Sequence, residues 1–457
     1  MKYLRSNRRK FTCIIIISAA LSLYTLFTLE TKIDRSTLRQ PWNLMARAQL
    51  SNNTKLLSSD GNRMPTAERK YCNNTNFTQP EKTSKGHDDI IEAKVDYRVE
   101  AFPSEGHWTN KLQLPKLISC GGRQPRSVLI EQASHWTNNT QKADILIFSG
   151  AINCEDIWLE LESKRQPNQI WVFTTEESPF TSRDSVPPPK VSHIHFNITS
   201  TYHPKADIIL PYGRFFPFSK RGKRKVAFTS NFNKKKGLMA WISSHCSTEM
   251  WRRYDAVHDL SGYIPIDMFG ECGELSCPER TGHHCPKVFS RYKFIVAFEN
   301  SCCCGYITEK FWYTVTRYNA IPVVIGPPKM DYEQLVPPNS FIHADDFSSM
   351  KDLAEHILRV SKDQALYDSY FKWKTIGKAV NTLIGDILAF SNVGMCRLIH
   401  FIQEKHNEPQ KQPFDPYGPN WMGGCNECGE RNWVKEYSTF RYYNEEMDDR
   451  YNFTYFN

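Results

Sequence analysis

The stretch KFIVAFENSCCCGYITEKFWYTVTRYNAIPVVIG, residues 293–326, decides the fold of this chain. Its ends, 294–298 and 321–325, are apolar runs rich in β-branched residues, which is typical of buried strands. Between them lie a polar loop and about three turns of helical pattern that begin at Thr308. This order predicts one strand–loop–helix–strand unit of a parallel sheet, with an anion-binding helix N-terminus beside the loop.

Similar apolar runs on both sides of this stretch predict an α/β protein with two sets of strands. The earlier runs are 127–130, 143–148, 169–173 and 208–210, and those of the second set begin at Val226 and include 266–270 and 341–343. A helical pattern at 354–360 continues into 367–373. Residues 213–224 are basic and contain Gly and Pro, which indicates a linker between the two sets.

The first thirty residues have a different character. Five basic residues precede an apolar run at 11–29, which is long enough to span about 30 Å of hydrocarbon. A cleaved signal peptide has a shorter apolar core and a small-x-small cleavage motif, so we favour an uncleaved signal anchor. The excess of positive charge predicts a cytosolic tail at 1–10 and a lumenal remainder.

Sequons, cysteines and charge are compatible with a lumenal protein. Of fourteen cysteines, Cys13 lies in the predicted span, and the odd number that remains requires at least one thiol outside intrachain disulfides. The net charge of +9 includes five charges from the tail, so no nucleic-acid partner is expected, and the basic runs 220–225 and 234–236 are interpreted as a solvated linker and loop. Six Asn-x-Ser/Thr sequons occur, at Asn52, Asn73, Asn76, Asn138, Asn197 and Asn452.

Two polar regions flank the predicted sheets. Residues 30–107 carry three of the sequons and few apolar clusters, which predicts a stem. Residues 392–457 form an extension with an aromatic tail and the pair Cys425 and Cys428.

The segment FENSCCCGYITEK, residues 298–310, resembles the donor-binding signature of the α1,3-fucosyltransferases, glycosyltransferase family 10, which typically reads FENS-x-C-x-[DE]-Y-[IV]-T-E-K. The resemblance implies GT-B architecture, with two Rossmann-like domains facing a cleft. It assigns 108–222 to an acceptor-side domain and 223–391 to a domain that binds GDP-fucose. Gly305 departs from the pattern, because an acidic residue is usual there.

The same resemblance assigns roles to residues of the signature. Lys310 matches the lysine that contacts the donor pyrophosphate, and Glu309 matches the carboxylate at the fucose end of the donor. Asn300, Ser301 and Tyr306 match other donor-binding positions. Without the family match, a Glu–Lys pair in the first turn of a helix indicates ordinary capping and solvation.

A second donor element is SSHCSTEMWRRYDAVHDLSGYIPIDMFGECG, residues 243–273, which resembles the family stretch from S-N-C to V-D-x-Y-G-x-C-G. Its donor-binding positions fall on Ser244 and on Arg253, with Arg252 as the near alternative. A guanidinium group suits bidentate contact with phosphate. His245 stands where Asn is usual.

The general base is expected across the cleft, after the predicted strand 170–173. Glu177 lies in an E-S-P string that matches the family's proposed base, and Glu176 is its local rival. A second string, residues 201–213, resembles the family's T-Y-R-x-D-S-D-x-x-x-P-Y-G, in which Tyr202 matches a tyrosine that approaches the donor. His203 and Ala206 replace the usual Arg and Ser of this string.

No Asp-x-Asp metal motif occurs in the sequence, so no cofactor is expected, although a divalent metal can stimulate such enzymes. The pair Asp345 and Asp346 is interpreted as a helix cap. Cys302, Cys303 and Cys304 suggest a disulfide with extra thiols, in which Cys303 matches the family cysteine. For Cys425 and Cys428 we favour a local disulfide or two bridges to a distant loop over a redox motif. A zinc site at Cys272, Cys277, Cys285, His283 and His284 ranks below disulfides.

The resemblance implies a Golgi type II membrane enzyme that moves L-fucose from GDP-β-L-fucose, with inversion, to the 3-hydroxyl of a GlcNAc. The acceptor is either the core GlcNAc of a glycoprotein N-glycan, which the extension favours, or a GlcNAc in Galβ1,4-GlcNAc antennae. An oligomer is compatible with the sequence. Two other classes remain open: a lumenal glycan-binding protein without turnover, and a redox protein that works through the CxxC pair.

Overall fold

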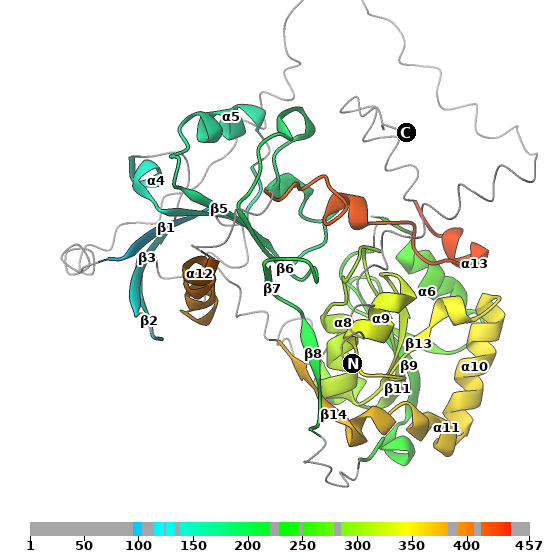
Figure 1. The fold of residues 1–457 in the computed structure, drawn as a ribbon. Coiled ribbons are helices and arrows are strands. Elements are labelled where there is room, and N and C mark those ends of the chain that lie inside the picture. The colour runs from blue at the N-terminus through cyan, green and yellow to red at the C-terminus, as the bar shows by residue number, and fades with distance from the viewer. Residues whose placement is uncertain are drawn as a thin grey trace, which may run out of the picture. The chain divides into compact units, whose positions relative to one another are not determined.

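The computed structural model describes residues 95–102, 114–122, 125–132, 138–152, 154–219, 228–246, 250–277, 285–382, 392–405 and 413–439 (Figure 1). The predicted cytosolic tail, the predicted span at 11–29 and most of the predicted stem lie outside these residues. Within the described ranges, no helix combines the length and apolar character needed to cross a bilayer. The expectation of an α/β fold with two sets of strands is confirmed.

The first sheet has seven strands in the order β2-β3-β1-β4-β5-β6-β7. Neighbouring strands are parallel except for the antiparallel pair β2 and β3. The strands are β1 Tyr97–Phe102, β2 Lys116–Cys120, β3 Arg126–Gln132, β4 Ile145–Phe148, β5 Ile170–Thr175, β6 Ile198–Thr201 and β7 Ile208–Ile209.

Alternation along β4 divides the core of this sheet between two faces, because successive side chains of a strand point to opposite sides. Leu146 and Phe148 pack with Trp158 of α5 (Glu155–Ser163), next to the short helix α4 (Asn138–Lys142). Ile145 and Ile147 pack with Leu398 of α12 (Asn392–Lys405). A disulfide from Cys120 to Cys396 joins α12 to β2, so part of the predicted C-terminal extension completes the first sheet.

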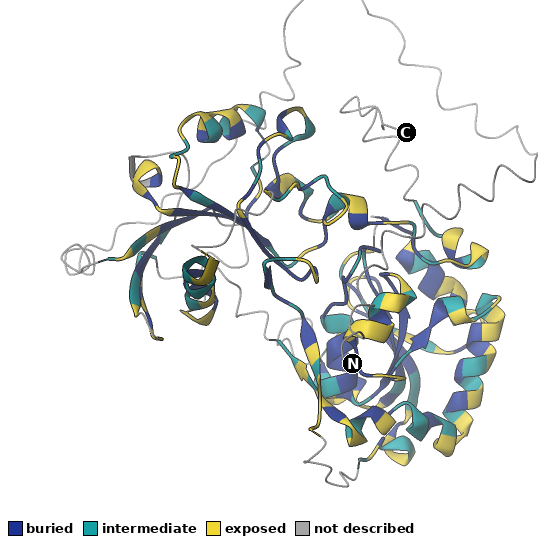
Figure 2. Cartoon of the chain, viewed as in Figure 1, coloured by how far each residue is buried: buried dark blue, intermediate teal, exposed yellow. Residues whose placement is uncertain are grey.

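The second sheet has five parallel strands in the order β10-β9-β11-β12-β13. Its strands are β9 Gly237–Ile242, β10 Ile266–Phe269, β11 Tyr292–Phe298, β12 Ile321–Ile325 and β13 Ile342–His343. Its helices are α6 Arg253–Ser261, α7 Pro286–Phe289, α8 Glu309–Tyr313, α9 Lys329–Leu335, α10 Met350–Lys362 and α11 Gln364–Ser369. Figure 2 shows buried residues running along the strands of both sheets.

The stretch that opened the sequence analysis folds as expected. β11 and β12 are parallel neighbours, and α8 with the π-helical turn Thr314–Tyr318 connects them. In chain order the second sheet reads 2-1-3-4-5, so its connections change direction between β9 and β11. In open parallel sheets, ligands bind beyond the carboxyl ends of the strands at such a switch point.

Three predicted boundaries differ from the structure. β1 lies within the segment predicted as stem, because the charged residues Arg98 and Glu100 interrupt its apolar pattern. The predicted linker 213–224 contains β8 (Gly213–Pro217), which pairs with β14 (Gly377–Asn381). The predicted helix 354–360 does not continue into 367–373, because the side chain of Asp363 caps a new helix, α11.

The basic run 234–236 is not a fully solvated loop. Lys235 is buried, and its Nζ donates to the carbonyl oxygen of Tyr318 at 2.9 Å. Burial and the charge of Lys374 lower the pKa of Lys235 to about 7. The run therefore leads directly into β9, which the sequence analysis did not predict.

Candidate active site

Arg253 lies at the switch point, between the carboxyl ends of β9 and β11. Its Nη1 donates to the carbonyl oxygen of Phe298 at 3.3 Å, and its Nη2 donates to Ser243 Oγ at 3.0 Å. The side chain is buried, whereas Arg252 is exposed and donates to the carbonyl oxygen of Glu436. Of the two predicted arginines, Arg253 is thus the one at the ligand-binding edge of the sheet.

Ser243 and Ser244 have different neighbours. Ser244 Oγ, which the sequence analysis singled out, lies 3.3 Å from Nδ1 of His245. Ser243 was not singled out, yet its hydroxyl accepts from Arg253 and donates to the carbonyl oxygen of His245. The local signal for Ser243 is its place as the residue directly after β9.

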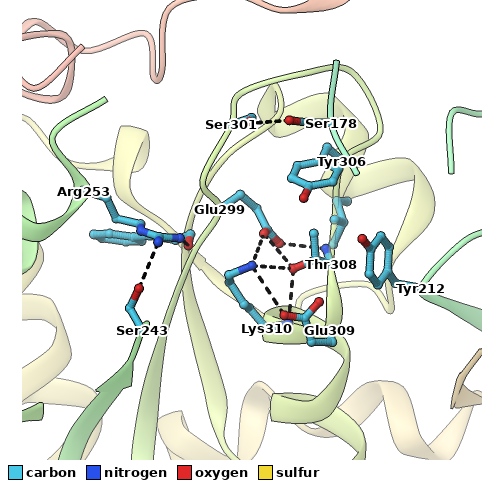
Figure 3. Close-up of polar contacts among 12 residues, drawn as sticks. Ser178, Tyr212, Ser243, Arg253, Glu299, Ser301, Tyr306, Thr308, Glu309 and Lys310 are labelled. Carbon is cyan, nitrogen blue, oxygen red and sulfur yellow. Dashed lines mark hydrogen bonds and ion pairs between the residues drawn. The ribbon is translucent and has the colours of Figure 1, made fainter. Parts of the chain in front are cut away.

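Glu299 anchors the β11 loop, which we define as residues 299–308 (Figure 3). Its carboxylate is fully buried and accepts from the backbone N–H of Thr308 at 2.7 Å and from the Thr308 hydroxyl at 2.7 Å. It also accepts from Lys310 Nζ at 3.2 Å. Burial raises the pKa of Glu299, and the Lys310 charge and the Thr308 hydrogen bonds oppose that rise. Sequence analysis placed Glu299 on the loop without giving it this role.

Lys310 lies among carboxylates and retains partial access to solvent. Its Nζ is 3.2 Å from Glu299, 3.5 Å from Glu309 and 3.0 Å from Thr308 Oγ1, and a quarter of the side chain is exposed. Burial disfavours the ammonium ion, but the two carboxylates outweigh it and the pKa of Lys310 is raised. Lys310 is therefore a fixed cation at the edge of the sheet.

The predicted helix start at Thr308 is confirmed. The N–H groups at this start, however, are hydrogen-bonded inside the protein and do not form the expected anion site. Thr308 is the N-cap of α8, and its hydroxyl accepts from the backbone N–H of Lys310. The backbone N–H of Thr308 is bonded to Glu299. Since these two N–H groups already have acceptors inside the protein, the positive charge at this edge of the sheet comes mainly from the side chains of Lys310 and Arg253.

The other predicted donor residues also lie on the β11 loop. The carboxamide oxygen of Asn300 is buried without a hydrogen bond to any described residue, an arrangement that leaves an acceptor unsatisfied. Gly305, the departure from the family pattern, has φ of 74° and donates its N–H to Asp331 at 2.7 Å. A Cβ there would lie 2.6 Å from Pro204, so the loop leaves no room for a larger residue.

Glu177 lies on the β5 loop, residues 176–179, directly after β5. Glu177 Oε2 accepts from the hydroxyl of Tyr306 at 2.9 Å, and Ser178 Oγ lies 2.7 Å from Ser301 Oγ. The structure therefore brings the predicted base and the predicted donor loop together. Tyr202, another predicted donor residue, packs against Tyr306 with ring centroids 4.8 Å apart.

Glu176 and Glu177 have different environments. Burial, together with the neighbouring charges of Glu177 and Glu309, raises the pKa of Glu176 to about 8. The backbone carbonyl oxygen of Glu176 accepts from the Tyr212 hydroxyl at 2.8 Å. Glu177 is exposed and its carboxylate accepts a hydrogen bond. Burial thus disfavours the ionised form of Glu176, whereas Glu177 reaches solvent and accepts from Tyr306.

The C-terminal segment, residues 413–439, is bonded to the β11 loop. Disulfides join Cys302 to Cys428 and Cys303 to Cys425, which are the two bridges to a distant loop that the sequence allowed. Because Cys425 and Cys428 do not bond to each other, the CxxC redox interpretation is wrong. Cys304 remains a thiol.

The other proposed metal sites also have different explanations. Disulfides join Cys246 to Cys272 and Cys277 to Cys285, which excludes these cysteines as zinc ligands. Asp345 and Asp346 do not cap α10, because Ser349 does; Asp345 accepts from the N–H of Arg431 and Asp346 contacts Lys329. Among the described residues, no group of three or more His, Cys, Asp and Glu side chains is arranged to hold a metal ion.

Of the predicted sequons, the structure describes the side chain of Asn197. It is exposed, and its Oδ1 accepts from the backbone N–H of Trp171 at 2.8 Å. The backbone of Asn138 begins α4, and the remaining four sequons, Asn52, Asn73, Asn76 and Asn452, lie outside the described residues.

Comparison with known proteins identifies the family. A sequence model of glycosyltransferase family 10 (fucosyltransferase), C-terminal part, matches residues 232–414, and a fucosyltransferase N-terminal model matches residues 108–213. Together these matches cover more than half of the chain. The chain belongs to glycosyltransferase family 10.

Relatives within family 10 are known from several animals. Glycoprotein 3-alpha-L-fucosyltransferase A of Drosophila melanogaster is 31% identical over 302 residues, which cover 64% of this chain and 56% of that protein. A 4-galactosyl-N-acetylglucosaminide 3-alpha-L-fucosyltransferase of Pan troglodytes is 37% identical over 213 residues, 46% of this chain and 56% of that protein. The chain spans about half the length of the curated relatives it matches.

Solved structures of similar proteins include an alpha1,3-fucosyltransferase with GDP-fucose. The two chains are 14% identical with a TM-score of 0.41, and the match covers 73% of this chain and 95% of that chain.

We expect Glu176 to titrate with a midpoint near pH 8, since burial and like charges disfavour its carboxylate. Carbodiimide coupling, which requires a protonated carboxyl, followed by mass spectrometry of the labelled residue measures this midpoint. Glu177→Gln removes a neighbouring negative charge and should lower the midpoint, whereas Glu162→Gln, a distant control, should leave it unchanged. A midpoint near the ordinary glutamate value of about 4.3 would contradict the assignment of Glu176 as the protonated partner.

Proposed function

We propose that this protein is an inverting α1,3-fucosyltransferase that transfers L-fucose from GDP-β-L-fucose to the 3-hydroxyl of a GlcNAc on glycoprotein glycans. The observation that carries the proposal is the hydrogen bond from Tyr306 on the β11 loop to Glu177. The ammonium group of Lys310 lies at the same loop, bonded to Glu299. A base, a cation and the switch point of a parallel sheet thus lie at one site. Membership of family 10 supports the donor, and the two largely parallel sheets support a GT-B architecture.

In the proposed reaction, Glu177 takes the proton of the acceptor hydroxyl as its oxygen bonds to C1 of fucose from the face opposite the diphosphate. The bond between C1 and the phosphate oxygen breaks, and GDP departs with the electron pair. Lys310 and Arg253 offset the charge that develops on the diphosphate. The carboxylate of Glu309, which lies 3.5 Å from Lys310 Nζ, would face the positive centre on the sugar.

Among acceptors, we favour the core GlcNAc of an N-glycan. The name of the Drosophila relative specifies a glycoprotein acceptor, and its match to this chain is the longer of the two reported above. The second candidate is a GlcNAc within Galβ1,4-GlcNAc antennae, which the name of the Pan troglodytes relative favours. The residues proposed for transfer are compatible with either acceptor.

The proposal includes a location. The basic tail at 1–10, the apolar run at 11–29 and the polar stem support a single-pass type II protein of the Golgi membrane whose enzymatic part is lumenal. The disulfides of the described residues are compatible with an oxidising compartment.

Fucose transfer by the full-length protein, measured in EDTA, tests the proposal. A core-exposed N-glycopeptide and N-acetyllactosamine are offered side by side with GDP-fucose. We expect transfer without added metal and faster transfer to the glycopeptide. Faster transfer to N-acetyllactosamine would select the antenna acceptor, and GDP binding without transfer to either would instead favour a glycan-binding protein.

Glu177→Gln should lower turnover by about 10²–10⁴-fold, the usual contribution of a general base, because an amide cannot accept the acceptor proton. The affinity for GDP, measured by calorimetry, should change little. Turnover equal to that of the unmodified protein would rule out Glu177 as the base.

Lys310→Ala should weaken GDP binding by about 10–100-fold, because it removes a charged hydrogen-bond donor to phosphate. Lys329→Ala is the matched control, since Lys329 also pairs with two carboxylates, Glu333 and Asp346, at a different part of the sheet. Its GDP affinity should stay within about twofold. Equal losses in the two variants would show that the effect of Lys310 is not local.

A further inference from the structure

Two hydrogen bonds join neighbouring residues of the β5 loop to the β11 loop. The Tyr306 hydroxyl donates to Glu177 Oε2 at 2.9 Å, and the hydroxyls of Ser178 and Ser301 lie 2.7 Å apart. Ser178, Ser301 and Tyr306 are each at most 1% exposed, so water competes poorly for these bonds. The predicted base therefore rests on the loop that carries the predicted donor contacts. Figure 3 shows the contact between Ser178 and Ser301.

The direction of the Tyr306 bond has a chemical consequence. Burial and the nearby charge of Glu177 raise the pKa of Tyr306 well above its ordinary value, so the phenol keeps its proton at any working pH. It can then donate to the ionised carboxylate of Glu177. A hydrogen bond to the charged form favours that form.

We propose that Tyr306 and Ser301 are positioning residues for the base, which set the orientation of Glu177 and hold its carboxylate ionised through the contact of Tyr306. The inference deepens the proposed function and rests on it. Ser301 acts through Ser178, the neighbour of Glu177, and the disulfide from Cys302 to Cys428 holds the next residue of the β11 loop in place.

Other groups also act on Glu177. Glu176, Tyr202, Tyr212 and Lys310 each interact electrostatically with it. Lys310 favours the ionised form and Glu176 opposes it when ionised. Tyr306→Phe removes one hydroxyl and leaves these four groups in place, so it isolates the contribution of the hydrogen bond.

Tyr212→Phe is a matched control. Tyr212 is also a buried tyrosine near Glu177, and its hydroxyl donates to the same loop, but to the backbone carbonyl oxygen of Glu176. Both variants lose one phenolic hydroxyl and one hydrogen bond to the β5 loop. Tyr306→Phe alone removes a bond to the carboxylate of Glu177.

Carbodiimide labelling of Glu177 across the pH range, read by mass spectrometry on the full-length protein, tests the inference. Tyr306→Phe should raise the labelling midpoint of Glu177 by about 1 pH unit, because the carboxylate loses a donor. The acid limb of the pH profile of kcat/KM should move upward by the same amount. Tyr212→Phe should move neither midpoint nor limb by more than about 0.3 pH unit.

A double-mutant cycle tests Ser301. Ser301→Ala should lower kcat by about fivefold, and Ser178→Ala at least as much, because Ser178 Oγ also contacts Thr181. The double variant should lose no more than Ser178→Ala alone, because the bond between the two serines is then already broken. Ser182→Ala removes the hydroxyl that donates to the carbonyl oxygen of Ser178 and is a control that lies just after the β5 loop. The loss of kcat in Ser182→Ala should add to the loss of kcat in Ser301→Ala when the two changes are combined. Additive losses for Ser178 and Ser301 would overturn the role of Ser301.

The outcomes separate the inference from the proposed function. Labelling does not require turnover, so an absence of fucose transfer would reject the proposed function while the labelling midpoint still decides the Tyr306 contact. An unchanged midpoint in Tyr306→Phe, or an equal shift in Tyr212→Phe, overturns the inference. If Tyr306→Phe does not fold, the serine cycle decides whether the β11 loop positions the base.

Discussion

The buried carboxylate of Glu299 is the interaction on which the site depends. A carboxylate without solvent contact is unfavourable unless donors surround it, and here the Thr308 backbone, the Thr308 hydroxyl and Lys310 supply them. The same bonds fix the start of α8 and the position of the Lys310 ammonium group. In our proposal Lys310 binds the leaving group, and Lys310 is held in position by the carboxylate of Glu299, which is shielded from solvent.

A second constraint is the close contact between the two sheets' loops and the C-terminal segment. Trp421 packs against both Phe173 of β5 and Tyr202, and Phe414 pairs with Phe196 before β6. A few residues further on, Cys425 and Cys428 bond to the β11 loop. One short segment thus contacts the strand that leads to the base and the loop that leads to the cation. We infer that these contacts limit the relative movement of the two loops.

Sequence reasoning identified the elements whose pattern is local. The runs 294–298 and 321–325 coincide with β11 and β12, and the Thr308 cap is visible as a Ser/Thr residue before a helical pattern. β1 and β9 were missed, because two charged residues interrupt the first and a lysine run precedes the second. Apolar residues at Met395, Leu398, Ile399 and Ile402 have helical spacing and could have revealed α12.

Contacts between distant segments could not be predicted in the same way. The sequence and the family pattern placed Glu177 after one strand, and Tyr306 and Lys310 in a different segment, and only the fold joins Glu177 to Tyr306. The contact between Ser178 and Ser301 spans 123 positions of the chain and has no local pattern. The choice between Arg252 and Arg253 depended on the phase of α6, which begins at Arg253 and turns that side chain toward β11.

The order of the disulfide partners along the chain has a consequence for biosynthesis. Cys302 and Cys303 leave the ribosome 126 and 122 residues before Cys428 and Cys425, the cysteines to which they bond. The loop that carries the predicted donor contacts therefore cannot form these cross-links until Cys425 and Cys428 have been synthesised. A chain that stopped short of Cys425 would present three adjacent thiols, at Cys302, Cys303 and Cys304, where the finished protein has one.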